Sequence, residues 1–166
     1  MTREPLFLKF INKEIGAEDL LHAFSRSSDS VTREAAEQAL KNPPDLEDFR
    51  KELIEAVSDI IKEGPGEEFK AFVNNYMESS LIEDVERRDF SLGENVSRSA
   101  RIKDSDSPWV QGFLCYNVCL YIKAFGLEDL KRCKVCSKFF NHKGKYAVYC
   151  GDPCKTKQKS IEQSKK

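Results

Sequence analysis

The sequence predicts a mainly α protein, with a multi-helix domain over residues 1–128 and a small unit of one β-hairpin and one helix over residues 129–166. Apolar residues recur at helical spacing through most of residues 4–125, and Pro and Gly stand at the ends of those patterns. The last part of the chain instead holds four closely spaced cysteines. A chain of 166 residues can form one substantial core with one small appendage.

Three short helices are expected before residue 42. The first covers residues 4–13, and the second covers residues 17–27, where Leu20, Leu21 and Phe24 lie at helical spacing. A third begins at Ser30, a suitable N-cap, and runs to residue 41. The Asn-Pro-Pro that follows ends it, because proline has no backbone N–H to donate and disfavours helix in the residue before it.

Two amphipathic helices are expected next. The first has Asp45 as its N-cap, ends at Gly64, and carries one apolar face made of Leu46, Phe49, Leu53, Val57 and Ile60. After Pro65 and Gly66 break the chain, a second helix carries a stripe of Phe69, Phe72, Val73, Tyr76 and Met77.

The pattern is weakest over residues 88–107, which are rich in Ser, Asp and Arg. A short hairpin around Gly93 and a long loop both remain open here. Ser107 and Pro108 then mark a helix start, and the helix is predicted to run to Phe125, before Gly126. It is apolar on nearly every side, which is typical of the central helix of a domain.

Composition indicates an ordinary globular protein, with 33% charged residues and a mean hydropathy of -0.56. The longest apolar run lies within residues 113–122 and is too short to cross a bilayer. The first five residues include Glu4 and Pro5, where a secretory signal would have basic and then apolar residues. We therefore expect a cytoplasmic protein whose cysteines are reduced thiols.

Four of the six cysteines, Cys133, Cys136, Cys150 and Cys154, form the pattern C-x2-C-x13-C-x3-C. Two intervening residues allow a tight turn that directs both sulfurs to one point, and three place the second pair on one face of a helix. The thirteen residues between the pairs are expected to form a hairpin with strands at residues 137–141 and 145–149. Four thiolates are a preferred ligand set of tetrahedral zinc and leave no position for water. The pattern predicts a treble-clef finger around one structural Zn²⁺.

Other uses of these cysteines are less well supported. A redox pair would need a strand–helix–strand context that is absent here. An iron–sulfur cluster also takes four thiolates and stays open as the alternative to zinc. We favour zinc because the pairs are close together and the second pair opens a helix.

The remaining metal-ligating residue types are expected to be structural. Cys115 and Cys119 lie four residues apart in the most apolar helix, so we expect core packing instead of a second metal pair. His142 in the hairpin loop and His22 in an early helix are expected to be a surface residue and a structural residue, respectively.

The residues around the cysteines also resemble a known family. Leu130 stands three residues before Cys133, an aromatic pair follows Cys136, and an aromatic residue precedes the second cysteine pair. In these features residues 130–159 resemble the CGNR-type treble-clef zinc fingers of bacterial proteins. The resemblance implies that the same four cysteines bind the metal, and that the protein has a nucleic-acid-binding or transcription-regulatory role. The Gly-Asn-Arg that names the family is replaced by Lys-Thr-Lys after Cys154, and Ser137 stands where glycine is usual, which predicts a slightly strained turn.

Charge is strongly polarised along the chain. Residues 1–130 have a formal charge of -10, with 16 Lys/Arg and 26 Asp/Glu, whereas residues 131–166 have +9, with 11 and 2. A basic segment of this kind has salt-sensitive affinity for phosphate backbones. Its candidate nucleic-acid contacts are Lys131, Arg132, Lys155, Lys157 and Lys159. Arg132 is its only arginine, so binding is expected to be largely independent of base sequence.

Two other classes of function are alternatives to nucleic-acid binding. In a protein-interaction or structural module, the finger would hold the helical body, or its lysines would meet acidic groups of a partner; the helical domain could also form a homo-oligomer. An enzyme is not expected, because no nucleophile triad, metalloprotease motif, P-loop or dinucleotide loop is present. The acidic residues Glu83, Asp84, Glu86 and Asp89 are interpreted as a solvated helix face.

Overall fold

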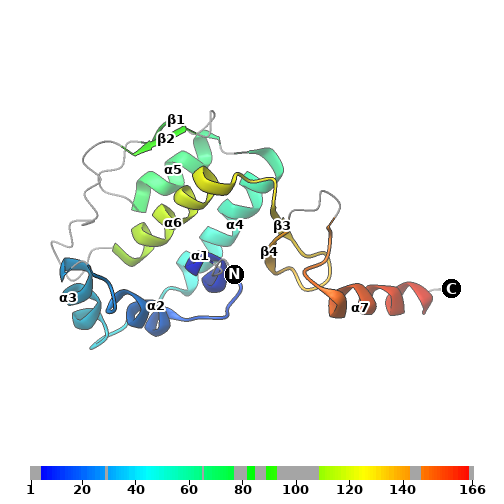
Figure 1. The fold of residues 1–166 in the computed structure, drawn as a ribbon, viewed down its shortest axis with the longest axis horizontal. Helices are drawn as coiled ribbons and strands as arrows, with labels where there is room; N and C mark the ends of the chain where they lie inside the picture. Colours follow the sequence, from blue (N-terminus) through cyan, green and yellow to red (C-terminus); the bar gives the residue numbers. More distant parts are fainter. Residues whose placement is uncertain are drawn as a thin grey trace.

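The computed structural model describes residues 5–28, 30–64, 66–76, 82–84, 89–92, 109–142 and 147–164. This part of the chain is mainly helical, with two short antiparallel hairpins, which confirms the predicted fold class (Figure 1). The helices are α1 (Leu6–Ile11), α2 (Ala17–Phe24), α3 (Ser30–Ala39), α4 (Glu47–Glu63), α5 (Glu67–Tyr76), α6 (Trp109–Phe125) and α7 (Asp152–Gln163). The strands are β1 (Ile82–Asp84), β2 (Asp89–Leu92), β3 (Leu130–Arg132) and β4 (Phe139–Asn141).

Helix α4 forms where the sequence predicts it. Its N-cap is Leu46 and not the predicted Asp45, but the Asp45 carboxylate, one residue earlier, accepts a hydrogen bond from the backbone N–H of Glu47 at 3.0 Å and so satisfies one of the free donors at the helix start. Gly64 ends the helix with φ = 83°, a conformation that favours glycine. The predicted apolar face is buried, with Leu53 and Val57 fully inaccessible.

Helix α6 is the central helix, as predicted. Most of its residues are buried, and it packs against α1 and α5. Aromatic contacts join it to the first two helices: the rings of Phe7 and Tyr121 lie 5.4 Å apart, and those of Phe24 and Phe113 lie 4.6 Å apart. These contacts fix α1 and α2 against the centre of the fold.

The hairpin of β1 and β2 corrects one expectation. β1 and β2 form an antiparallel hairpin in which the first strand ends at Asp84 and the second begins at Asp89. Gly93, around which a hairpin or a long loop was open, lies outside the described residues. The proposed solvated helix face is wrong, because Glu83 and Asp84 belong to β1 and Asp89 to β2. Strands this short hold too few residues to show an alternating pattern. Residues 93–108 lie outside the described part of the chain.

The second hairpin also differs from its prediction. β4 lies within the expected strand 137–141, but its partner is β3, with Leu130 opposite Asn141 and Arg132 opposite Phe139. Residues 147–149 form no strand, and the rest of the predicted strand lies outside the described residues. The first cysteine pair therefore lies in the turn of the hairpin and not ahead of it.

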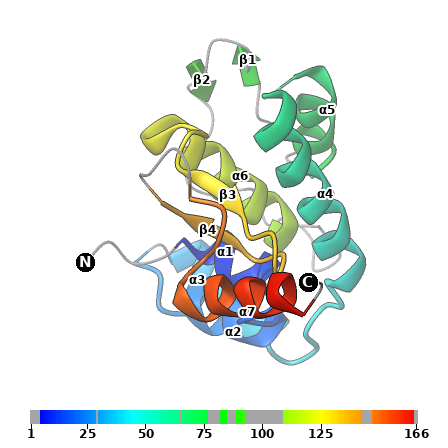
Figure 2. The same cartoon turned by 90° about the vertical axis from the view of Figure 1, so that its right-hand side faces the viewer.

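We refer to residues 129–164 as the finger and to α1–α6 as the helical body. The finger's hairpin packs on the body, since Leu130 and Phe139 are each 2% exposed and belong to the same core cluster as the helices. In contrast, α7 extends away from the body at the C-terminal end (Figure 1), and Figure 2, which looks at the molecule from that end, shows α7 in front of the body with α4 and α5 at the right. No described side chain of α7 is buried.

Candidate metal centre

The four predicted cysteines come together at the junction of β3, β4 and α7. Cys133 directly follows β3, and Cys136 lies in the turn before β4. Cys150 precedes α7, and Cys154 lies in its first turn, after Pro153. Proline is favoured at this position because the first helical residues need no N–H donor. Two turns and one helix start thus bring both pairs to one point.

The sulfur positions fit a single tetrahedral ion. All four Sγ atoms lie within 4.8 Å of one another. The Cys136–Cys150 separation is 3.5 Å and the Cys150–Cys154 separation is 3.6 Å. Four sulfurs bound at about 2.3 Å in a tetrahedron lie about 3.8 Å apart, whereas a disulfide requires about 2.05 Å. The cysteines are therefore arranged as a metal-ligand set and not as disulfides.

The electrostatics of the cluster also favour a cation. Burial raises the pKa of the Cys133 thiol, but hydrogen bonds from the backbone N–H groups of Cys136, Val135 and Cys150 outweigh it and lower that pKa to about 6. Burial, together with hydrogen bonds to its neighbouring thiols, raises the pKa of Cys150 to about 12. The cluster thus favours one thiolate and disfavours further ones. A bound divalent cation would offset the repulsion between neighbouring thiolates, and coordinating thiols lose their protons to such an ion.

The backbone around the first pair forms a tight knuckle. The N–H of Ser137 donates to the carbonyl of Cys133 at 2.9 Å, and the N–H of Cys133 donates to the carbonyl of Lys138 at 2.8 Å. Ser137 adopts φ = 60°, which confirms the strain predicted for a non-glycine residue here. The N–H of Lys134 donates to the carbonyl of Val148 at 3.1 Å, which ties the second half of the finger to the first.

Besides the buried Leu130 and Phe139, Asn12, just after α1, fixes the finger to the body by hydrogen bonds. Its side-chain N–H donates to the carbonyl of Phe139, and the N–H of Phe139 donates to its side-chain oxygen, both at 2.8 Å. The amide group therefore pairs with β4 as a neighbouring strand would. The sequence pattern around Asn12 gives no signal of this role, since the partner lies 127 residues away.

Two basic side chains reinforce this docking. The guanidinium of Arg132 donates to Ser58 Oγ on α4 at 3.3 Å and to the carbonyl of Ser137 at 3.2 Å, and it lies over the Phe139 ring at 5.3 Å. Lys138 forms an ion pair with Glu14 at 3.1 Å. Basic residues of the finger thus contact the body.

The residues named as nucleic-acid contacts are placed in two groups. Lys131 and Arg132 lie on β3 beside the body, and Lys131 Nζ donates to the carbonyl of Glu128 at 2.8 Å. Lys155, Lys157 and Lys159 lie on α7 and are exposed. None of these three forms an ion pair or side-chain hydrogen bond with the part of the chain that the structure describes. Of these five residues, Arg132 therefore contacts the helical body, whereas the lysines of α7 form a free basic helix.

The other cysteines and histidines lie outside the cluster. Cys115 and Cys119 on α6 are fully buried in the core, as predicted. Burial raises the pKa of Cys119 to about 12 and that of Cys115 well above its ordinary value, so both stay protonated. His142 follows β4 on the surface, and His22 lies in α2.

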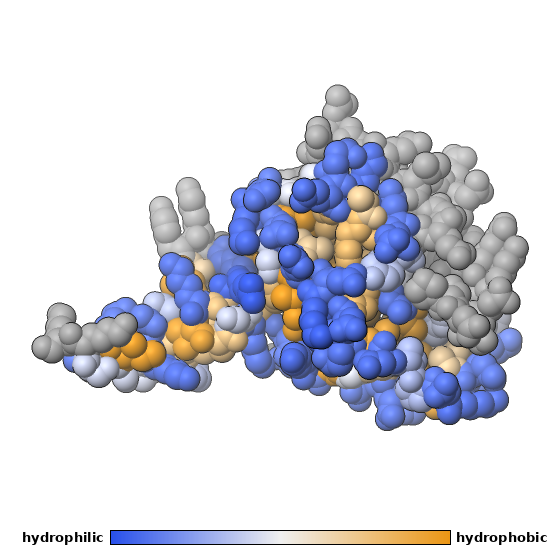
Figure 3. Space-filling view, turned by 180° about the vertical axis from the view of Figure 1, so that it is seen from behind, coloured by the Kyte–Doolittle hydropathy of each residue, from blue (hydrophilic) through white to orange (hydrophobic). Residues whose placement is uncertain are grey.

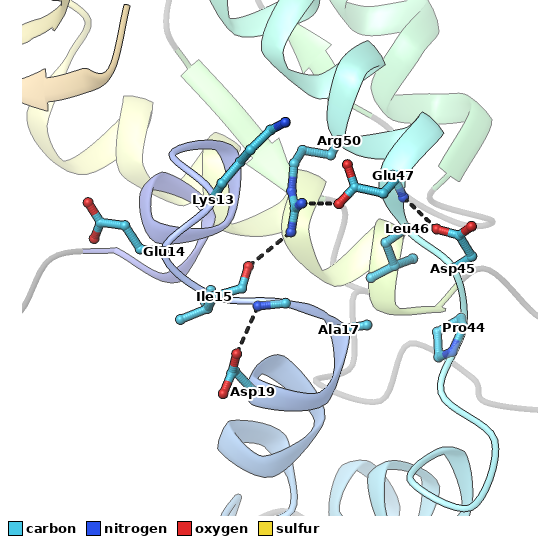
Figure 4. A pocket seen from close by; sticks show the side chains of 11 residues that line it. Lys13, Glu14, Ile15, Ala17, Asp19, Pro44, Asp45, Leu46, Glu47 and Arg50 are labelled. Atoms are coloured by element: carbon cyan, nitrogen blue, oxygen red, sulfur yellow. Dashed lines mark hydrogen bonds and ion pairs between the residues drawn. The ribbon is translucent and has the colours of Figure 1, made fainter. Parts of the chain in front are cut away.

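A pocket of about 430 Å³ lies between the α1–α2 connection and the start of α4 (Figure 4). At its floor the buried guanidinium of Arg50 donates to the carbonyl of Ile15 at 2.9 Å and pairs with the Glu47 carboxylate. The Asp19 carboxylate accepts from the backbone N–H of Gly16 at 2.9 Å. Most of the polar groups in Figure 4 are thus paired with one another. The hydrogen bond from Arg50 to Ile15 ties α4 to the α1–α2 connection, which begins at Asn12.

Comparisons with protein-family models, with curated proteins and with solved structures find no match to this chain. The resemblance to CGNR-type fingers therefore stays a prediction from the motif residues. No helix in the described ranges has both the length and the apolar character that a bilayer span requires.

Proposed function

We propose that the protein is a zinc-dependent nucleic-acid-binding protein with a regulatory role, in which one structural Zn²⁺ shapes the finger and α7 contacts phosphates. Zinc is supported by the donor set, since four thiolates at single-ion spacing suit Zn²⁺. In a four-iron cluster each cysteine binds a different iron, which requires a wider spread of sulfurs. Bound zinc would order the chain from Cys133 to Cys154 and fix the direction in which α7 leaves the body.

The observation that carries the proposal is the exposed, basic α7. A helix of 12 residues is marginal in water by itself, and this one buries none of its described side chains. Contact with a partner would give this helix the packing stabilisation that its own chain does not provide. Lys155, Lys157 and Lys159 give it a positive surface all round, which suits a phosphate backbone better than the edges of particular bases.

The experiment is a fluorescence-anisotropy titration of zinc-loaded protein with a labelled 20-base-pair duplex, repeated over a series of salt concentrations. The variant carries Lys155→Ala, Lys157→Ala and Lys159→Ala. The matched control removes the same charge from exposed lysines of the body, with Lys41→Ala, Lys51→Ala and Lys62→Ala. Loss of three phosphate contacts should reduce the slope of log K against log[salt] by about 2.7. No binding at micromolar protein and low salt, or equal weakening in the control, would contradict the proposal.

A second candidate, a protein-interaction module, is supported by the docking contacts of Arg132 and Lys138 with the body. In that case the finger positions α7 for an acidic protein surface. The α7 variant would then change complex formation and leave nucleic-acid retention unaffected, so the same titration separates the two functions.

A further inference from the structure

A groove of about 490 Å³ runs between α4 and α5. Its floor is apolar and includes Ala56, Ile60, Phe69 and Phe72, while its lining also holds six acidic residues: Glu52, Glu55, Asp59, Glu63, Glu67 and Glu68. Figure 3 looks at the side of the molecule on which α4 and α5 lie in Figure 2, and shows apolar side chains exposed between hydrophilic ones. Among the described residues that line the groove, none is basic.

The acidic rim is only partly neutralised. Asp59 pairs with Lys62 at 3.4 Å and Glu67 with Lys70 at 3.6 Å, both at the exposed surface where such pairs contribute little. Within the described residues the carboxylates of Glu55, Glu63 and Glu68 form no side-chain hydrogen bond or ion pair. An apolar strip edged by uncompensated carboxylates fits a helix that carries lysines and at least one apolar side chain.

We propose that this groove binds α7 of a second copy of the same chain. The two elements match in charge, since α7 carries the exposed Lys155, Lys157 and Lys159. They also match in spacing. Along α4, Glu55, Asp59 and Glu63 follow one another every four residues, about 6 Å apart, and Lys155 and Lys159 have the same separation.

Length and apolar contact agree with this assignment. The acidic stripe from Glu52 to Glu63 and the helix α7 each span twelve residues, about 18 Å. Ile161 on α7 is 38% exposed, and the half-buried Phe72 in the groove is an apolar side chain that it could contact. Of the three lysines, Lys157 lies nearest to Ile161, about 40° away around the helix.

A second copy is the natural donor, because α7 extends away from its own body (Figure 1). A reciprocal arrangement, in which each copy gives its α7 and accepts that of the other, closes as a two-fold dimer. It would cover both the exposed helix and the acidic groove at once, and it accounts for a chain with a strongly basic end and an acidic body but a net charge of only -1.

Sedimentation velocity of zinc-loaded protein at low salt, over roughly 5 to 200 µM, tests the proposal. Wild-type protein should form dimers that dissociate at high salt. A helix variant (Lys155→Glu, Lys157→Glu, Lys159→Glu) and a groove variant (Glu55→Lys, Asp59→Lys, Glu63→Lys) should each weaken self-association by roughly tenfold or more. Circular dichroism checks that both variants are folded.

Mixing the two variants gives the decisive result. The reversed helix of one then meets the reversed groove of the other, and the normal helix of the second meets the normal groove of the first. We expect the mixture to form heterodimers although each variant alone does not. A wild-type protein that stays monomeric at 200 µM, or a mixture that stays monomeric, overturns the proposal.

The proposed dimer rests on the same lysines of α7 as the proposed nucleic-acid binding, but different results would refute each of them. The groove variant keeps α7 unchanged, so it should lose the dimer and retain the duplex in the anisotropy titration. A wild-type protein that dimerises without binding the duplex would refute only the nucleic-acid function. A protein that binds the duplex as a monomer at every concentration would refute only the dimer.

Discussion

Replacement of Asn12 by alanine tests whether the finger is docked on the body as the structure describes. Asn12→Ala removes both hydrogen bonds to the backbone of Phe139, each 2.8 Å long and half-buried. A hydrogen bond of this kind contributes about 0.5–1.5 kcal/mol net, so the pair corresponds to about 1–3 kcal/mol of unfolding free energy. For a protein of this size each kcal/mol lowers the melting temperature by roughly 2–4 °C.

The assay is urea unfolding of zinc-loaded protein, monitored by the fluorescence of Trp109, the single tryptophan, which lies in the core beside Phe24. Asn12→Asp provides a nearly isosteric comparison. It keeps an acceptor for the Phe139 N–H but places an oxygen against the Phe139 carbonyl, so it should destabilise at least as much as Asn12→Ala. The matched control Asn75→Ala changes an exposed side chain of α5 and should stay within about 0.5 kcal/mol.

The effect should depend on the metal. A finger of this size buries too little apolar surface to fold by itself, and structural zinc contributes on the order of 10 kcal/mol to such units. In chelator-treated protein the docking contacts should already be lost, and Asn12→Ala should then change stability by less than about 0.5 kcal/mol. Equal destabilisation with and without zinc, or none with zinc, would refute the coupling of metal, finger and body.

Four further results are expected. Chelation should melt the finger while most of the helical circular dichroism remains, because α1–α6 have their own core; loss of most helical signal would contradict this. Ser137→Gly should raise the free energy of unfolding by about 1 kcal/mol, since it relieves φ = 60°, and a lower urea midpoint would show that the turn is unstrained. Tyr121→Phe should be neutral or stabilise by about 1 kcal/mol, because the buried hydroxyl of Tyr121 has no hydrogen-bond partner among the described residues. Burial raises the pKa of Tyr121 to about 12, so the wild-type protein should lose stability as the pH rises from about 10 to 12, and this loss should be smaller in Tyr121→Phe; an unchanged pH profile would contradict the assignment.

The elements that the sequence predicts best have strong local signals. Helix α4 carries its cap, its apolar stripe and its terminal glycine within the segment itself, and α6 is marked by Pro108 and by apolar residues on all sides. The four cysteines were predictable for the same reason, since their spacing encodes the turn and the helix start that bring them together. In each case the structure depends on neighbours in the sequence.

The features that were missed depend on distant partners. β3 has three residues and no alternation of its own, and it becomes a strand because the knuckle between Cys133 and Cys136 folds β4 back against it. The role of Asn12 depends on a backbone 127 residues away, and that of Arg132 on Ser58. Arg132 was named for its charge, but its hydrogen bonds hold the finger on the body. Charge and composition alone do not distinguish a docking residue from a free one.

The metal content of the purified protein tests the central claim most directly. Elemental analysis of protein produced without added chelator should give about one zinc per chain, and Cys136→Ser should reduce it strongly while Cys115→Ala, in the core, leaves it unchanged. A colourless protein with no bound metal, or iron accompanied by visible absorption from a cluster, would contradict the account.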